Sequence, residues 1–167
     1  LRIWVSAEDY RDDIRISKEI LSRLTEAYRK IRNTCRFLLG NVSGFDHTDR
    51  SADLGELDRW AMARLQGLTR KVTDAYENFN FHEVFHTIHN FCVVDMSSIY
   101  LDILKDRLYT FARDSRERRS AQTVLYELTL SLSKLLAPIV SHVAEEVWQH
   151  LPEDERREES ILLSPLR

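Results

Sequence analysis

A row of basic side chains on one predicted helix is the feature of the sequence best suited to binding chemistry. At about 100° per residue, five polar residues lie opposite the apolar face that contains Ile31: Lys18, Arg29, Arg32, Asn33 and Arg36. Guanidinium, ammonium and amide groups in such a row can donate hydrogen bonds to successive phosphate groups. A solvated helix face is the alternative, but few acids interleave with these arginines, whereas helices that are merely solvated usually mix both signs of charge.

Three histidines raise the question of a metal site. His82, His86 and His89 lie within an arc of about 60° on another predicted helix, and Glu83-x-x-His86 matches half of a di-iron pattern known from helical bundles. The second half is missing, because the similar spacing at 142–145 has the histidine first. A structural zinc site needs four ligands. We therefore predict no metal ligands, and interpret these histidines as residues at the edge of the core.

Signatures of catalysis are also missing from the sequence. There is no glycine-rich phosphate loop, no nucleophile elbow and no metalloprotease motif. His142 and Glu145-Glu146 could form an acid–base pair, but consecutive carboxylates on a helix usually face solvent. Trp60 and Trp148 could stack on bases, although both lie near apolar faces, where core packing is the simpler interpretation. We predict no catalytic residues.

Apolar residues recur at three- and four-residue steps along most of the chain. This spacing predicts amphipathic helices near residues 17–39, 55–78, 81–110, 115–136 and 138–151. Ser17 is a suitable N-cap, the first helix should stop at Gly40-Asn41, and the last should restart at Pro138. Five such helices joined by short loops predict an all-α fold, an antiparallel helical bundle.

The remaining segments lack this spacing. Residues 1–16 are mixed in character, with a weakly alternating stretch at 12–16. We expect them to be a connection from an upstream part of a longer protein. The start at Leu1 rather than Met agrees with this expectation. Residues 41–54 predict a loop, and the helix over 81–110 should run or bend through Ser97-Ser98. Residues 153–167 are charged and look frayed or truncated, so that the bundle itself spans 17–152.

Composition and charge narrow the class of protein. The 4 Gly and 3 Pro in 167 residues are few, which favours long helices. Residues 11–36 carry eight Lys/Arg against four Asp/Glu, whereas 145–159 carry seven acids and two arginines. This distribution favours a local anionic partner over a globally basic DNA binder. Two cysteines make no disulfide framework, and no apolar run is long enough for a membrane span, so we expect a cytoplasmic protein.

Five stretches of the chain form a recognisable series: Tyr28-Arg29-Lys30-Ile31-Arg32-Asn33-Thr34 with Arg36-Phe37-Leu38-Leu39-Gly40-Asn41, then Asp58-Arg59-Trp60, Tyr76-Glu77-Asn78-Phe79, Lys105-Asp106-Arg107-Leu108-Tyr109, and Leu136-Ala137-Pro138-Ile139 with His142, Glu145-Glu146 and Trp148. In this order they resemble the anticodon-binding domain of isoleucine-specific class I aminoacyl-tRNA synthetases of the bacterial and organellar type. The last of them is shared with the valine, leucine and methionine enzymes. The resemblance covers nearly the whole chain.

The resemblance implies a parent enzyme that ligates isoleucine to tRNA with ATP and magnesium. The two ATP signatures of that family, His-x-Gly-His and Lys-Met-Ser-Lys-Ser, do not occur here. We therefore expect a fragment that is not an enzyme and holds no cofactor, with zinc confined to a C-terminal extension of the parent that begins at 153–167. Residues 1–16 would be the connection from the catalytic domain.

The same resemblance implies that the bundle recognises the stem and anticodon loop of isoleucine-accepting tRNA. The expected RNA-binding residues are Lys18, Arg29, Lys30, Arg32, Asn33 and Arg36. The partners would be that tRNA and the catalytic domain of the parent chain, with no DNA and no membrane, and the protein would be a monomer. The alternatives are the same domain from a valyl- or leucyl-tRNA synthetase, a helical protein–protein scaffold, a metal-bearing bundle enzyme, and a basic face that packs against the catalytic domain instead of RNA.

Overall fold

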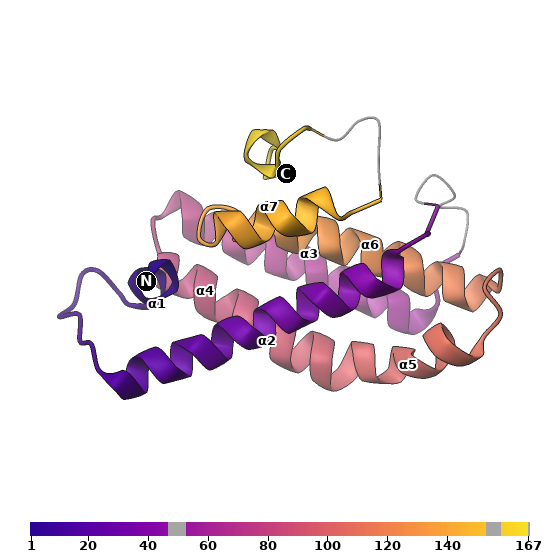
Figure 1. Ribbon diagram of the computed structural model, residues 1–167, viewed down its shortest axis with the longest axis horizontal. Helices are drawn as coiled ribbons and strands as arrows, with labels where there is room; N and C mark the ends of the chain where they lie inside the picture. The colour runs from indigo at the N-terminus through magenta and orange to yellow at the C-terminus, as the bar shows by residue number, and fades with distance from the viewer. Residues whose placement is uncertain (47–52, 153–157, 167) are drawn as a thin grey trace.

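The computed structural model describes residues 1–46, 53–152 and 158–166, and these form helices and connections without a strand (Figure 1). The predicted all-α helical bundle is confirmed. Part of the loop predicted over 41–54 and part of the C-terminal stretch lie outside the described residues. The elements are α1 (Arg2–Ala7), α2 (Lys18–Val42), α3 (Glu56–Glu77), α4 (Phe81–Asn90), the π-helix η1 (Phe91–Tyr100), α5 (Leu101–Thr110), α6 (Arg116–Leu136), α7 (Ser141–Gln149) and the 3₁₀ turn η2 (Ile161–Leu163).

Helix α6 forms the centre of the bundle. It packs against α2, α3, α5 and α7, and Val124, Leu125, Leu128 and Leu132 on it have no exposed surface. In Figure 1, α2 crosses the front of the molecule, α4, η1 and α5 follow one another as a single path, and α3 lies behind. The long helix α2 therefore has one side on the core and the other open to solvent.

The start of α2 is as predicted, but its end is not. The Ser17 hydroxyl accepts a hydrogen bond from the Ile20 amide at 3.1 Å, which is a side-chain N-cap. The expected stop at Gly40-Asn41 is wrong, because the helix continues to Val42. The Asn41 amide group donates to the Phe37 carbonyl at 2.8 Å, and Val42 is fully buried. Packing of Val42 thus overrides the turn tendency of the two residues before it.

The break between the helices predicted over 55–78 and 81–110 is confirmed. Helix α3 ends at Glu77, and Phe79 has a φ of 57° in the left-handed region, where a side chain is strained. The Asn80 amide donates to the Ala75 carbonyl at 2.8 Å, the six-to-one hydrogen bond of a Schellman motif. This turn reverses the chain and places α4 against α3.

The helix predicted over 81–110 is continuous but not uniform. Its central ten residues, Phe91–Tyr100, form the π-helix η1 between α4 and α5. The hydroxyls of Ser97 and Ser98 donate to the carbonyls of Cys92 and Val93, five residues back, both at 2.8 Å. The helix therefore runs through Ser97-Ser98 without a break, and its turns there are wider than those of an α-helix.

Three short segments depart from the sequence predictions. Residues 2–7 form α1, where a connection was expected, and Ala7 is buried. Helix α7 begins at Ser141 rather than 138, because the amides of Ile139 and Val140 both bond to the Leu136 carbonyl in a turn around Pro138. Residues 158–166 are not frayed, because Ile161 is buried and η2 packs on α7.

A buried carboxylate joins the helices at one end of the bundle. Asp58 on α3 has no exposed surface. Its Oδ1 accepts a hydrogen bond from the Tyr100 hydroxyl at 2.9 Å, and its Oδ2 accepts from the Ser120 hydroxyl at 2.6 Å and from Arg107 Nη1 at 3.3 Å. Buried charges need partners of this kind. The network fixes α3, η1, α5 and α6 relative to one another beneath the surface.

Candidate nucleic-acid interface

Helix α2 carries all six predicted RNA-binding residues on its exposed side. Lys18, Arg29, Lys30, Arg32, Asn33 and Arg36 are all solvent-exposed. Arg29 forms an ion pair with Glu26, one of the few acids near this row, at 2.7 Å. Within the described parts of the chain, the side chains of the other five have no hydrogen-bond or ion-pair partner. Their donors remain available to a ligand.

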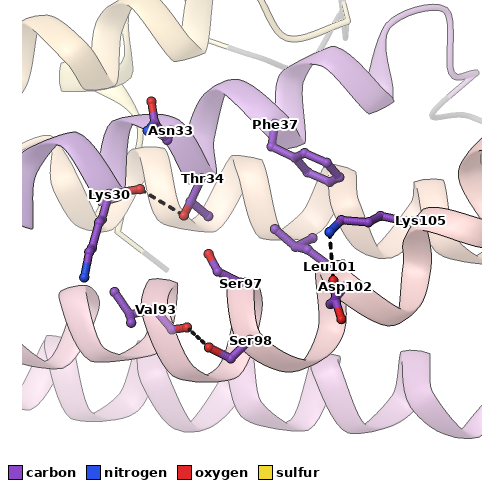
Figure 2. Close-up of a pocket in the computed structure, with 10 residues that line it drawn as sticks. All are labelled: Lys30, Asn33, Thr34, Phe37, Val93, Ser97, Ser98, Leu101, Asp102 and Lys105. Atoms are coloured by element: carbon purple, nitrogen blue, oxygen red, sulfur yellow. Dashed lines mark hydrogen bonds and ion pairs between the residues drawn. The ribbon is translucent and has the colours of Figure 1, made fainter.

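The exposed side of α2 is a ridge between two grooves rather than one continuous row. Arg32 and Arg36 line a groove of about 200 Å³ toward α7, whose far wall includes Glu146. Lys30 and Asn33 line a second groove of about 420 Å³ toward η1 and α5 (Figure 2). Four of the six residues therefore divide between the two flanks of α2, whereas Lys18 and Arg29 line neither groove.

Exposed aromatic residues near the end of α5 were not among the predicted site residues. Tyr109 is 67% exposed and Phe111 is 42% exposed. Arg113 is exposed in the same connection to α6, and Arg116 pairs with Asp53 at 2.7 Å. Aromatic rings beside cations suit stacking of unpaired bases. Tyr109 ends one of the stretches that resemble the synthetase family, and this resemblance could have identified it as a candidate site residue.

The three histidines of α4 have three different environments. His86 Nε2 lies 3.2 Å from the Ala7 carbonyl, His82 Nε2 lies 3.9 Å from Asp9 Oδ2, and the His89 ring stacks on Phe85 with centroids 6.2 Å apart. Burial lowers the pKa of His89, and the positive charges of Lys30 and His86 lower it further. Two of these histidines therefore bridge α4 to the N-terminal segment, and the third packs within α4.

Other side chains with potential chemistry are used in packing. Trp148 is almost fully buried and donates to the Glu158 carbonyl at 2.9 Å, and Trp60 packs against the core, so the core interpretation of both tryptophans is confirmed. Glu145 accepts hydrogen bonds from Gln149 and Ser160, at 2.7 and 2.8 Å. The two cysteines are buried free thiols, and burial raises the pKa of Cys35 to about 12.

The fold and this surface define the class of protein as a helical bundle with an open cationic side that suits a polyanion. Residues 58–167 match the family described as the anticodon-binding domain of tRNA ligase, and the chain belongs to this family. The matched region begins at Asp58, the buried carboxylate of the network described above. No helix among the described residues is long and apolar enough to cross a membrane.

Full-length relatives extend the similarity to α2. The chain is 56% identical to the isoleucine–tRNA ligase of Syntrophotalea carbinolica over 166 residues, 54% identical to that of Moorella thermoacetica over 167, and 53% identical to that of Caldicellulosiruptor saccharolyticus over 167. Each comparison covers 98% of this chain and 18% of the relative. The chain therefore spans about a fifth of the length of these relatives, and the similar part includes the basic helix.

Proposed function

We propose that this bundle is the tRNA-recognition module of an isoleucine–tRNA ligase and that it binds isoleucine-accepting tRNA. Membership of the anticodon-binding family supports an RNA ligand. Similarity to enzymes named isoleucine–tRNA ligase over 98% of the chain favours isoleucine over the valine and leucine alternatives. The observation that carries the proposal is the exposed side of α2, where Arg32 and Arg36 lack partners among the described residues.

The contribution of this chain would be binding rather than chemistry. The sequence contains neither ATP signature of the parent family. Activation of isoleucine with ATP and magnesium would take place in a catalytic domain of the parent chain, and zinc would be held in its C-terminal extension. The parent would act as a monomer in the cytoplasm. The bundle itself would hold no cofactor.

Two parts of the surface would have different tasks in recognition. Phosphate contacts set position and carry no sequence information, and Arg32 and Arg36 suit them because a guanidinium group binds phosphate in a bidentate manner. Unpaired bases are recognised by stacking and by hydrogen bonds to their edges. Tyr109 and Phe111 suit that task, because both rings are exposed.

The salt dependence of tRNA binding tests this proposal. We expect the chain to bind an isoleucine-accepting tRNA transcript with an affinity that falls as salt rises, because each neutralised phosphate releases counterions. The double variant Arg32→Ala/Arg36→Ala should weaken binding and reduce the slope of log K against log salt by about 0.7 to 0.9 for each lost contact. A matched control is Arg70→Ala/Lys71→Ala, which removes two exposed cations from α3, behind α2.

Three outcomes separate the alternatives. Binding that is weakened only by the α2 variant supports the proposal. Equal binding and equal slope for both variants would mean that the basic side of α2 packs against the catalytic domain instead. The absence of any salt-dependent tRNA binding would favour a protein–protein scaffold. Comparison of tRNAs for isoleucine, valine and leucine then tests the assignment to isoleucine.

A further inference from the structure

A groove of about 420 Å³ lies between α2 and the continuous path of η1 and α5 (Figure 2). Its volume falls within the range of about 300–1,000 Å³ that is typical of small-ligand sites. Lys30 lies toward one end, and Phe37 and Lys105 toward the other. The remaining lining residues are Asn33, Thr34, Val93, Ser97, Ser98, Leu101 and Asp102.

The free positive charge of the groove is concentrated at one end. Lys105 Nζ lies 2.7 Å from Asp102 Oδ1, so these two charges offset each other. Lys30 has no ion-pair partner among the residues that the structure describes. An anionic group is therefore favoured near Lys30, whereas the end near Phe37 is close to neutral.

The exposed hydroxyl groups of Ser97 and Ser98 are acceptors toward a ligand. Each donates its hydrogen to a backbone carbonyl, Ser97 to Cys92 and Ser98 to Val93, both at 2.8 Å, whereas Thr34 is buried. With their hydrogens used in this way, the oxygens offer only lone pairs to a ligand. Donors on a ligand, such as amino groups, are therefore matched here.

The π-helix is responsible for this arrangement of hydroxyls. The carbonyls that accept from Ser97 and Ser98 lie five residues earlier, at the wide turns of η1. Such turns are rare and occur frequently at functional sites. Beside them, the partly buried ring of Phe37 and the side chains of Val93 and Leu101 provide apolar surface.

We propose that this groove binds one unpaired nucleotide of the RNA, with its phosphate at Lys30 and its base against Phe37. This rests on the proposed function, because it assigns part of the same tRNA to a defined place. Seven residues of helix, about 10 Å, separate Lys30 and Phe37 along α2. The hydroxyl acceptors favour the exocyclic amino group of adenine, cytosine or guanine over uracil, whose pairing edge has only the N3–H as a donor.

Blocking the groove tests the inference. Ser98→Trp places a large side chain in the groove, and Ile103→Trp is the matched control, because Ile103 is exposed on α5 and does not line it. The probe is an isoleucine-accepting tRNA transcript treated with dimethyl sulfate, which modifies the pairing edges of unpaired adenine and cytosine, together with a reagent for the pairing edge of guanine. We expect one unpaired nucleotide to be protected by the unmodified chain and by the control, and to become reactive with Ser98→Trp.

A second variant separates stacking from charge. Phe37→Leu keeps apolar volume but removes the aromatic ring, and should weaken tRNA binding by about five- to a hundredfold with no change in the salt slope. Lys30→Gln should instead reduce the slope by about 0.7. Circular dichroism and the urea midpoint show whether each variant is folded.

The outcomes distinguish this inference from the proposed function. If the unmodified chain fails to bind tRNA, the proposed function fails and the groove assignment fails with it. If tRNA binds and the protected nucleotides are the same for every folded variant, the groove assignment alone is overturned. A loss of affinity for Phe37→Leu without release of a single nucleotide overturns it as well.

Discussion

The hydroxyl of Tyr100 donates a hydrogen bond of 2.9 Å to Oδ1 of Asp58, a carboxylate with no exposed surface. Tyr100 is the last residue of the π-helix, and Asp58 lies in the first turn of α3. Ser120 and Arg107 complete the partners of the carboxylate. Helix η1 forms one wall of the nucleotide groove. Its α4 end continues from α4, and its other end, at Tyr100, is therefore held by this polar network.

Replacement of Asp58 by asparagine should destabilise the bundle strongly. The amide retains the shape of the carboxylate, but its nitrogen would face Ser120 or Tyr100 as a second donor, and Arg107 would lose its counter-charge. Breaking a buried pair in this way costs about 3–5 kcal/mol, which urea unfolding can measure. The matched control is Asp102→Asn on α5, where an exposed carboxylate pairs with Lys105. A small loss for Asp58→Asn, equal to that of the control, would contradict a structural role for the network.

The sequence predicted the long helices because their apolar spacing is regular, but it missed features that depend on contacts between distant residues. The six-residue helix α1 is too short to show a period and has no side-chain cap. Gly40 indicated a helix end, but the burial of Val42 extends the helix beyond it. Nothing in 91–100 indicated a π-helix, because its wide turns become visible only through bonds such as that from Ser97 to Cys92.

Only part of the candidate site could be predicted, because the rest depends on which helices lie beside α2. Helical periodicity correctly places Arg32 and Arg36 on the exposed side of α2. It could not show that Lys30 and Asn33 face η1 while the arginines face α7, because neighbouring helices define the grooves. Tyr109 escaped notice because an exposed aromatic residue and a core residue look alike in a sequence.

Lys30 should control the titration of His89. Burial lowers the pKa of His89 below its ordinary value of 6.5, and Lys30 lowers it further. Lys30→Gln should therefore raise that pKa, as measured by NMR titration of the ring protons. Lys18→Gln removes an equal charge from the start of the same helix, about 18 Å along α2 from Lys30, and should leave the pKa of His89 unchanged. Equal titration curves for both variants would mean that Lys30 does not act on His89.

The same shift has a consequence for stability. As pH falls through 6.5, the unfolded chain takes up a proton at His89 while the folded chain resists it, so the free energy of unfolding should decrease with falling pH. The stability that depends on neutral His89 is fully present above pH 6.5. His89→Gln should make the decrease shallower in urea titrations at several pH values. An unaltered pH dependence would show that other groups dominate in this range.

Glu145 should hold the C-terminal segment on α7 only while it is charged. The hydrogen bond from Gln149 lowers the pKa of Glu145 below its ordinary value of 4.5, and those from Ser160 and the Ile161 amide lower it further. A lowered pKa in the folded state means that the attachment is intact above about 4.5 and is lost as pH falls through that lowered value. The amide nitrogen of Ile161 lies 3.1 Å from Glu145 Oε2, so its proton should report the titration of Glu145 by NMR. Glu145→Gln should abolish it, whereas Glu146→Gln on the same helix should not.

Adjacent residues of α2 should separate folding from RNA binding. Ile31 is only 4% exposed within the core, whereas Arg32 is exposed and has no partner among the described residues. Ile31→Asp buries an unpaired charge, which the bundle can avoid only by unfolding or by protonating the carboxylate, so the helical signal in circular dichroism should be lost at neutral pH. Arg32→Asp leaves the core intact and places a negative charge where a phosphate is expected. It should therefore keep the circular dichroism spectrum and urea midpoint close to those of the unmodified chain while weakening tRNA binding more than Arg32→Ala does, because repulsion is added to the lost contact. If Arg32→Asp binds tRNA as well as the unmodified chain at low salt, this side of α2 does not face the RNA.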